Sequence, residues 1–267
     1  MKRIETDELR ALQLKVLEVF HNYCIDNGLK YSLACGTLIG AIRHNGYIPW
    51  DDDIDVFMMR DDYDRFIKRF PLVYMDSYRL MSFERNKNWC RAYANLYDDR
   101  TIKRENKTSD EDIVGINIDV FPIDNVPDGK FMWKLYDSFR RLLIYITTAK
   151  YIKAKDHSLF KKTVIVLLKV LFFPFSPYFF TRLVDSYAKL FNKKQTKRVF
   201  ENVCGIIQKR PFDRNDFSET ILYKFESYEF YIMEGYDDYL VNGYGDYMKL
   251  PPENKRISHH TSIYYWK

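Results

Sequence analysis

The segment Asp53–Met58 begins with alternating carboxylate and aliphatic side chains and then becomes wholly apolar. Successive side chains of a β-strand point to opposite faces, so this pattern predicts a strand with Ile54 and Val56 in the core. Asp53 and Asp55 would share the other face, where two nearby carboxylates raise each other's pKa unless a cation lies between them. Oxygen ligands without a neighbouring Cys or His favour Mg²⁺ or Mn²⁺ over Zn²⁺. The pattern thus favours a metal-dependent enzyme over an acidic turn that merely precedes a strand.

The charge of the 267-residue chain is distributed unevenly. Residues 48–64 are acidic, whereas the segments Lys150–Lys169 and Lys189–Arg198 are rich in lysine. The net charge of +5 is weaker than the basic bias of most nucleic-acid-binding proteins, so no nucleic-acid partner is expected. The basic second half is instead expected to face a membrane surface or an anionic substrate.

The four cysteines are far apart in the sequence, and none of them forms a C-x-x-C pair. This spacing predicts free thiols in a reducing compartment rather than disulfides or a zinc site. The first residues of the chain turn polar where a signal peptide would need its apolar region, so we expect a cytoplasmic protein.

Local periodicity predicts an α/β first half. Helices are expected over residues 7–27, 38–44 and 61–70. Strands are expected over residues 31–34, 53–58, 78–83, 92–97 and 113–121. Pro122 is expected to end the last strand, and the turn-rich residues that follow mark a boundary. We therefore expect an α/β (α+β) core domain over residues 1–128.

The second half, residues 129–267, is expected to be mainly helical and to complete the site on the side away from the acidic strand's own domain. Helices are predicted at 131–150, 156–172, 178–192 and 196–208, followed by a hairpin near 219–233 and a short helix near 236–242. The apolar stretch over residues 163–175 is shorter than the roughly 20 residues that a spanning helix needs. It is expected to be either a buried helix or, within residues 160–181, a peripheral contact with the inner face of the membrane.

Gly36-Thr37 lies between a predicted strand and a predicted helix. Glycine lets a phosphate approach the backbone, the exposed amides and helix dipole attract the anion, and the threonine hydroxyl can bond a phosphate oxygen. An ordinary N-cap has the same pattern, but the acidic strand one helix later makes phosphate binding the more specific interpretation. Asp119, on a strand of its own, is the expected third carboxylate, either a metal ligand or a base, unless it is a half-buried capping residue.

Several stretches of the sequence resemble motifs of the LicD family. Residues 31–44 (YSLACGTLIGAIRH) and 46–55 (GYIPWDDDID) resemble its opening motif. Residues 118–122 (IDVFP) resemble its second acidic strand, and residues 244–252 (YGDYMKLPP) resemble its C-terminal motif. The motifs bracket nearly the whole chain, whereas residues 130–215 contribute little to the resemblance.

The resemblance implies a nucleotidyltransferase-like fold and transfer of a phosphorylated alcohol from a CDP-activated donor to a sugar hydroxyl. The usual donor of bacterial members is CDP-choline, and the fukutin-type relatives use CDP-ribitol. By position, Asp53 and Asp55 would bind the metal and Asp119 would complete the acidic cluster. Gly36 and Thr37 would hold the donor phosphates. The acceptor would be a cell-surface glycan or its lipid-linked oligosaccharide precursor, in lipopolysaccharide, capsule or teichoic acid.

Four further residues are candidates for donor or acceptor contacts. Trp50, next to the acidic strand, could hold the quaternary ammonium of choline through cation–π attraction, although most such rings only pack. Arg43 could neutralise a phosphate, although its position at a helix C-terminus explains it equally well. Arg256 and His259 could contact the substrate, or could belong to a solvated basic terminus.

Three other functions fit part of the pattern. A conventional nucleotidyltransferase, in which the nucleotide's own phosphorus is attacked, needs much the same residues. A glycosyltransferase could use Asp53-Ile54-Asp55 to hold Mn²⁺ and a nucleotide sugar, but there the motif usually follows about a hundred residues of nucleotide-binding α/β structure, longer than the segment available here. A non-enzymatic membrane-surface protein could use the acidic strand as a structural cation site, although the Gly36-Thr37 turn beside three carboxylates argues against it.

Overall fold

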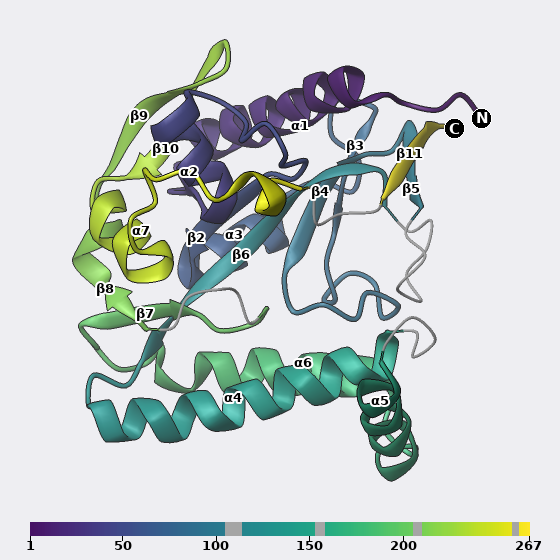
Figure 1. The fold of residues 1–267 in the computed structure, drawn as a ribbon, viewed down its shortest axis with the longest axis vertical. Helices are drawn as coiled ribbons and strands as arrows, with labels where there is room; N and C mark the ends of the chain where they lie inside the picture. The colour runs from purple at the N-terminus through teal and green to yellow at the C-terminus, as the bar shows by residue number, and fades with distance from the viewer. Residues whose placement is uncertain (105–113, 153–157, 205–209, 258–261) are drawn as a thin grey trace.

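The computed structural model describes residues 1–104, 114–152, 158–204, 210–257 and 262–267 (Figure 1). The helices are α1 (Thr6–Asp26), α2 (Cys35–His44), α3 (Arg60–Arg69), α4 (Lys130–Tyr151), α5 (Leu159–Leu171), α6 (Pro177–Ala188) and α7 (Tyr236–Tyr244), with short 3₁₀ helices at Lys189–Phe191, Arg214–Phe217 and Glu253–Lys255. The strands are β1 (Ser32–Leu33), β2 (Asp55–Met59), β3 (Tyr78–Met81), β4 (Ala94–Asp98), β5 (Thr101–Arg104), β6 (Ile116–Val126), β7 (Arg198–Glu201), β8 (Phe212–Asp213), β9 (Thr220–Phe225), β10 (Tyr228–Met233) and β11 (Ile263–Trp266).

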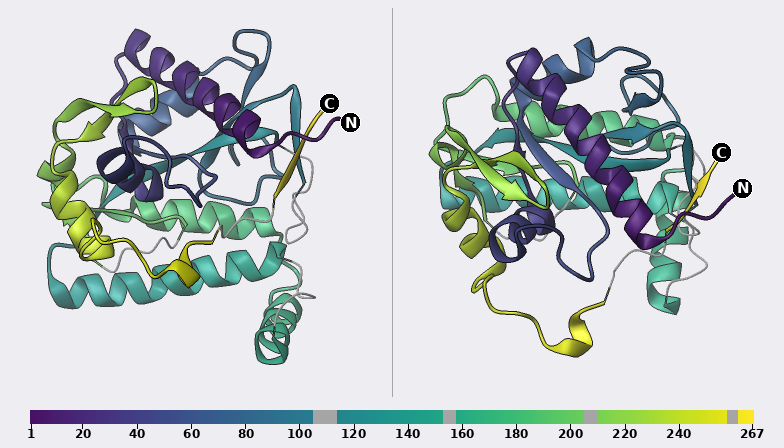
Figure 2. Two further views of the ribbon diagram at one scale, coloured as in Figure 1. Left: turned by 45° about the horizontal axis from the view of Figure 1, so that its top comes forward. Right: turned by 90° about the horizontal axis from the view of Figure 1, so that it is seen from above.

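A mixed sheet forms the centre of the fold. Within the described residues it contains seven strands, in the order β1-β2-β6-β4-β3, with β7 paired to β6 and β8 paired to β7. The pair β2–β6 is parallel and the other pairs are antiparallel. The 11-residue strand β6 crosses the molecule with α1 on one side and α4 and α6 on the other (Figures 1 and 2). Its place next to β2 brings the two acidic segments of the sequence together.

The predicted end of the central strand at Pro122 is wrong, because β6 continues to Val126. One edge of β6 pairs with β4 up to Val120 and with β7 from Ile123 onward, so Pro122 lies where the neighbouring strand changes. Proline has no amide hydrogen to contribute to a ladder. At Pro122 no neighbouring strand on that edge requires an amide donor, so β6 continues beyond the proline.

The predicted helix over residues 196–208 is also wrong. Strand β7 occupies part of this segment, and its buried Val199 and Phe200 pair with the last residues of β6. The extension of β6 beyond the proline supplies a hydrogen-bonding edge that local periodicity does not reveal, and pairing with that edge overrides the helical pattern. Residues 205–209 of the predicted helix lie outside the described residues.

The second half contains strands as well as helices. Helices α4 to α7 and the hairpin β9–β10 lie within a few residues of their predicted positions. However, β7 and β8 join the sheet of the first half, and β11 pairs with β5. The protein is therefore a mixed α/β fold in which the mainly helical second half is not confirmed. The nucleotidyltransferase-like core and the division of the chain at residue 128 remain predictions.

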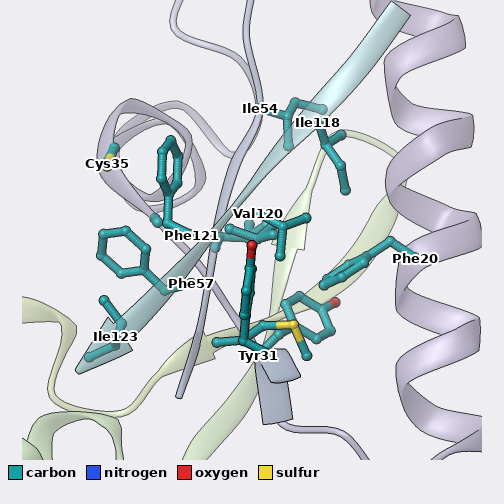
Figure 3. Close-up of a cluster of buried hydrophobic side chains, with 14 of the residues drawn as sticks. Phe20, Tyr31, Cys35, Ile54, Phe57, Ile118, Val120, Phe121 and Ile123 are labelled. Carbon is teal, nitrogen blue, oxygen red and sulfur yellow. The ribbon is translucent and has the colours of Figure 1, made fainter. Parts of the chain in front are cut away.

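A cluster of aromatic and aliphatic side chains lies beneath the acidic ends of β2 and β6. Figure 3 shows side chains from α1, α2, β2 and β6 converging there. Phe20 and Tyr31 meet edge to face with ring centroids 4.9 Å apart, and Phe57 and Phe121 do so at 6.2 Å. Such aromatic pairs contribute about 0.5–1.5 kcal/mol beyond the burial of their area. This packing holds the two strands rigidly under the candidate site.

The first and last described residues meet at one corner of the molecule (Figures 1 and 2). The Ile4 amide donates to the Tyr264 carbonyl at 2.9 Å, and the Trp266 amide donates to the Lys2 carbonyl at 2.9 Å. The Trp266 indole also donates to the Glu8 carboxylate at 3.0 Å. The two ends of the chain are thus bonded to each other, and β11 also pairs with β5.

Candidate active site

Asp55 and Asp119 lie side by side at the start of the parallel pair β2–β6. They are register partners, and the Asp119 amide donates to the Ile54 carbonyl at 2.8 Å. β2 begins at Asp55 rather than at Asp53 as predicted, so Asp53 belongs to the loop that leads into the strand. The pairing of β2 with β6 brings together the acidic strands that the sequence predicts to be neighbours.

Negative charge outweighs positive charge around this pair. Burial raises the pKa of Asp55 well above its usual range, and repulsion from Asp53 and Asp119 raises it further. Burial likewise raises the pKa of Asp119, while Lys103 and Arg91 oppose that shift. An opposite charge among such carboxylates favours their ionised form, so the site would be stabilised by a cation.

Two amide side chains hold Asp119 in place. Asn95, its register partner on β4, donates to Oδ1 of Asp119 at 2.5 Å. Asn117 of β6 donates to the same oxygen at 2.6 Å. Because both bonds reach Oδ1, they fix the orientation of the carboxylate. The sequence analysis did not single out either asparagine; in the alternation of β6, Asn117 shares a face with Asp119, which is a local signal.

Helix α2 begins at Cys35, so Gly36 and Thr37 lie in its first turn, where amides lack intrahelical acceptors. The Thr37 hydroxyl accepts a hydrogen bond from the Asp55 amide at 2.9 Å and thereby ties the helix to the acidic strand. A Cβ atom at Gly36 would lie 2.5 Å from Oδ2 of Asp51. Glycine therefore lets the Asp51 carboxylate approach the start of α2. Contact of Gly36 and Thr37 with donor phosphates remains a prediction.

Helix α1 holds the loop that precedes the acidic strand. One guanidinium nitrogen of Arg10 donates to the carbonyls of Pro49 and Asp51, both at 3.0 Å. The buried Gln13 donates to the Asp52 carbonyl at 2.8 Å. Sequence analysis missed both residues, although a glutamine inside the apolar stripe of a helix is a detectable signal. These bonds position the backbone that carries the carboxylates.

Trp50 and Arg256 meet, although they come from distant parts of the chain. The guanidinium carbon of Arg256 lies 5.7 Å from the Trp50 ring centroid, and the Arg256 Nε donates to the Pro251 carbonyl at 2.8 Å. The His44 ring packs edge-on against Trp50 at 6.3 Å. Two of the predicted contact residues thus form one cation–π pair beside the acidic loop. His259 lies outside the described residues.

Arg43 also contacts the C-terminal segment. Its guanidinium donates to the Tyr247 carbonyl at 2.5 Å and to Nε2 of His44 at 2.9 Å. Burial lowers the pKa of Arg43 below its usual value. The contact with Tyr247 gives Arg43 a role in holding the C-terminal segment against α2, and phosphate neutralisation by this residue stays a prediction.

A small cavity is lined by residues that lie within the electrostatic influence of Asp119. It is bounded by the segment before β4, the end of α4, α6 and the residues after β7, and its lining includes Arg91, Tyr93, Thr147, Tyr151 and Cys204. Burial raises the pKa of Tyr93 and of Cys204, and the nearby charge of Asp119 contributes to both shifts. Arg91 was not predicted, because its approach to Asp119 depends on the pairing of β4 with β6.

The acidic cluster is chemically suited to a hard divalent cation. Asp53, Asp55 and Asp119 offer only carboxylate oxygens, which Mg²⁺ and Mn²⁺ prefer. In the described part of the chain no three carboxylate, imidazole or thiol groups already stand at coordinating spacing. A cation would therefore draw these side chains closer together, and the raised pKa values of Asp55 and Asp119 fit such a need.

Residues 28–150 match the family described as LicD/FKTN/FKRP, nucleotidyltransferase domain. Over 279 aligned positions the chain is 31% identical to the lipopolysaccharide cholinephosphotransferase LicD of Haemophilus influenzae, and the match covers 99% of each protein. The chain belongs to the LicD family. The resemblance of its motifs to that family is thereby confirmed.

The LicD match over residues 28–150 contains α2, the acidic pair and Arg91, whereas Arg10 and Arg256 lie outside it. Shorter matches join the chain to uncharacterised proteins of Rickettsia typhi, 37% identical over 81 residues, and Rickettsia prowazekii, 34% identical over 92 residues. They cover 30% and 34% of this chain, and 26% and 34% of the respective relatives. In this LicD-family member, Arg10 precedes residues 28–150 and Arg256 follows them, and both contact the loop before the acidic strand.

Proposed function

We propose that this protein is a transferase that moves phosphocholine from CDP-choline to a hydroxyl of a cell-surface glycan, such as that of lipopolysaccharide, or of its lipid-linked precursor. The observation that carries the proposal is the Asp55–Asp119 pair beside the first turn of α2. Similarity over the whole length to a relative named as a lipopolysaccharide cholinephosphotransferase supports the choice of donor and acceptor. The glycan of capsule or teichoic acid is an acceptor of the same chemical class.

The reaction would form one phosphodiester and break one phosphoanhydride. An oxygen of the acceptor hydroxyl attacks the phosphorus that carries choline, and the bond from this phosphorus to the CMP oxygen breaks. CMP leaves with the bonding electrons, and the hydroxyl proton passes to a carboxylate of the acidic cluster or to solvent. Asp53, Asp55 and Asp119 would hold Mg²⁺ or Mn²⁺, which when bound neutralises phosphate charge and acidifies the hydroxyl.

The chain's own residues would orient the donor. The first-turn amides of α2 and the guanidinium of Arg91, which is close enough to influence the pKa of Asp119, would suit the diphosphate. Trp50 would offer the quaternary ammonium of choline an aromatic face. Because Arg256 already lies over this ring, choline would use the opposite face or displace Arg256. A reaction on a lipid-linked acceptor would take place at the inner face of the membrane.

A CMP-release assay tests the proposal. Purified protein would be incubated with CDP-choline, CDP-ribitol, CDP-glycerol, UDP-glucose or CTP, each with a deacylated lipopolysaccharide acceptor and with Mg²⁺, Mn²⁺ or EDTA. We expect metal-dependent CMP release from CDP-choline, and background release from the variant Asp53→Ala/Asp55→Ala. Asp26→Ala, which removes an exposed carboxylate at the end of α1, is the matched control and should keep full activity.

Each competing function predicts a different product. UDP from UDP-glucose would support a glycosyltransferase, and pyrophosphate from CTP would support nucleotidyl transfer. Equal CMP release with EDTA would contradict the metal requirement. Release of CMP from CDP-ribitol alone would keep the reaction class and replace the donor.

A further inference from the structure

Helix α5 is almost entirely exposed. Of its 13 residues, all of which the structure describes, Ile165 is the one that is buried. The most exposed apolar side chains of the helix are Leu159 (84%), Phe160 (80%), Leu167 (61%), Val170 (68%) and Leu171 (65%). A helix of this length is marginal in water without tertiary packing. Helix α5 therefore presents an apolar surface that a partner would stabilise.

Polar contacts attach α5 to the rest of the molecule. The Lys150 ammonium donates to the Phe172 carbonyl at the end of α5 at 3.0 Å, and the Lys169 ammonium donates to the Ile152 carbonyl at the end of α4 at 2.8 Å. These reciprocal bonds satisfy carbonyls at two helix C-termini. They hold α5 so that it projects from the edge of the molecule formed by α4 and α6 (Figures 1 and 2).

The neighbouring elements also expose apolar side chains. Further exposed residues on α4, after α5 and on α6 are Phe131, Leu135, Phe139, Leu142, Phe173, Phe175 and Phe179. Large apolar residues exposed together on three adjoining elements mark an interaction site rather than scattered surface hydrophobicity. We name α5 with these seven residues the α5 surface.

The charge of α5 and of the residues that follow it is one-sided. From Ser158 to Val184 the sequence contains four basic residues and no Asp or Glu. Lys161, Lys162 and Arg182 are exposed. Basic side chains among aromatic and aliphatic ones are typical of segments that lie in the interface of an anionic bilayer. A second copy of the chain would instead bring like charges together, which disfavours self-association through this surface.

The dimensions also suit a helix that lies on a membrane. Helix α5, with 13 residues, is about 20 Å long, shorter than a bilayer's hydrocarbon core. In the part of the chain that the structure describes, no helix has the length and hydropathy needed to cross a membrane.

Helix α4 leads from the α5 surface toward the region of the acidic pair. Its outer residues belong to the surface, whereas Ile144, Thr147 and Tyr151 near its end line the small cavity that also contains Tyr93 and Cys204. The charge of Asp119 acts on both Tyr93 and Cys204. A lipid anchor held at the α5 surface would therefore place an attached glycan on the side of the molecule where α4 approaches the candidate active site.

We propose that the α5 surface docks on an anionic lipid bilayer and so presents a lipid-linked acceptor to the candidate active site. The bilayer contact does not depend on the proposed function, whereas the presentation of the acceptor rests on it. Vesicle binding and donor turnover are therefore measured separately.

Flotation with vesicles of phosphatidylcholine, with and without phosphatidylglycerol, tests the bilayer contact. We expect the protein to bind the vesicles that contain phosphatidylglycerol and to be released by high salt. The variant Phe160→Ser/Leu167→Ser/Val170→Ser should bind at least about tenfold more weakly, since membrane affinity scales with the apolar area inserted. The matched control Ile25→Ser/Leu72→Ser/Val241→Ser removes exposed apolar residues elsewhere and should bind as the unaltered protein does.

Further variants keep the test decisive. Lys161→Glu/Lys162→Glu should also weaken binding, and it tests the surface if the serine variant fails to fold. Asp55→Asn should bind vesicles normally, which separates the docking from the chemistry. Absence of vesicle binding, or binding equal in all variants, would overturn the proposal. A dimer that the serine variant converts to a monomer, without vesicle binding, would identify the surface as a contact between copies and would also overturn it.

Discussion

Arg60 forms a bidentate salt bridge with Asp124, with both nitrogen–oxygen distances at 2.7 Å. The same guanidinium donates to Asp185 at 3.0 Å, and all three side chains are buried. The residues belong to α3, β6 and α6. This cluster therefore ties the strand that carries Asp119 to helices of both halves of the chain.

Replacement of Arg60 by leucine should destabilise the fold. Asp124 and Asp185 would become buried carboxylates without their main cation, a change that typically costs about 3–5 kcal/mol of the free energy of unfolding. Urea unfolding followed by circular dichroism measures the loss. Lys15→Leu, which breaks the exposed pair with Glu18 at 2.8 Å, is the control and should cost less than about 1 kcal/mol. Equal effects of the two variants would contradict the importance of burial.

Gly36→Ala should impair activity more than stability. The new Cβ would lie 2.5 Å from Oδ2 of Asp51, so the carboxylate must move away from the start of α2. Small displacements at reacting groups are costly, and we expect kcat/KM for CDP-choline to fall at least about tenfold. The unfolding midpoint should change little. Gly129→Ala, where no atom lies within 4 Å of the added Cβ, should leave both quantities unchanged.

Asn95→Ala should lower the affinity of the site for Mg²⁺, although it removes no proposed metal ligand. Asn95 is buried and orients Asp119 through the 2.5 Å bond to Oδ1. Loss of such an outer partner typically costs 10- to 100-fold in metal affinity, so the Mg²⁺ concentration for half-maximal CMP release should rise by about that factor. The exposed Asn88→Ala serves as the control. An unchanged Mg²⁺ dependence would mean that Asp119 does not need this support.

Asp216 should make stability depend on pH between about 4 and 6. Burial, together with the carboxylates of Asp213 and Asp238, raises the pKa of Asp216 from 3.8 to about 6. The folded state thus binds more protons than the unfolded state in this range, so the free energy of unfolding falls as the pH rises through it. Asp216→Asn should flatten this part of the pH profile and stabilise the protein at neutral pH. Urea midpoints across the range measure the effect, and an unaltered profile would contradict it.

The elements that local patterns specify were predictable from the sequence. The stripe of α1, the alternation at Ile54 and Val56, and the hairpin β9–β10 each depend on neighbouring residues, and the structure contains all three. The partnership of β2 with β6 was expected from the acidic segments, and the register of Asp55 with Asp119 agrees with it.

Elements that depend on distant pairing were not predictable in this way. β7 looked helical because its partner edge exists only once β6 passes through Pro122, and β11 has a place only beside β5. The supporting residues of the site were missed for the same reason. Arg10 contacts the acidic loop, and Arg91 lies near Asp119, only in the folded chain. No spacing in the sequence predicts either neighbour.

The pairing of β11 with β5 has a consequence for synthesis of the chain on the ribosome. β5 and the first residues are made early, but the strand that covers them ends at Trp266. Until that residue leaves the exit tunnel, the edge of β5 lacks this partner, and Ile4 lacks the carbonyl of Tyr264. A nascent chain can therefore pair its acidic strands long before β11 can pair with β5. Chaperones that bind the nascent chain would encounter β5 without this partner.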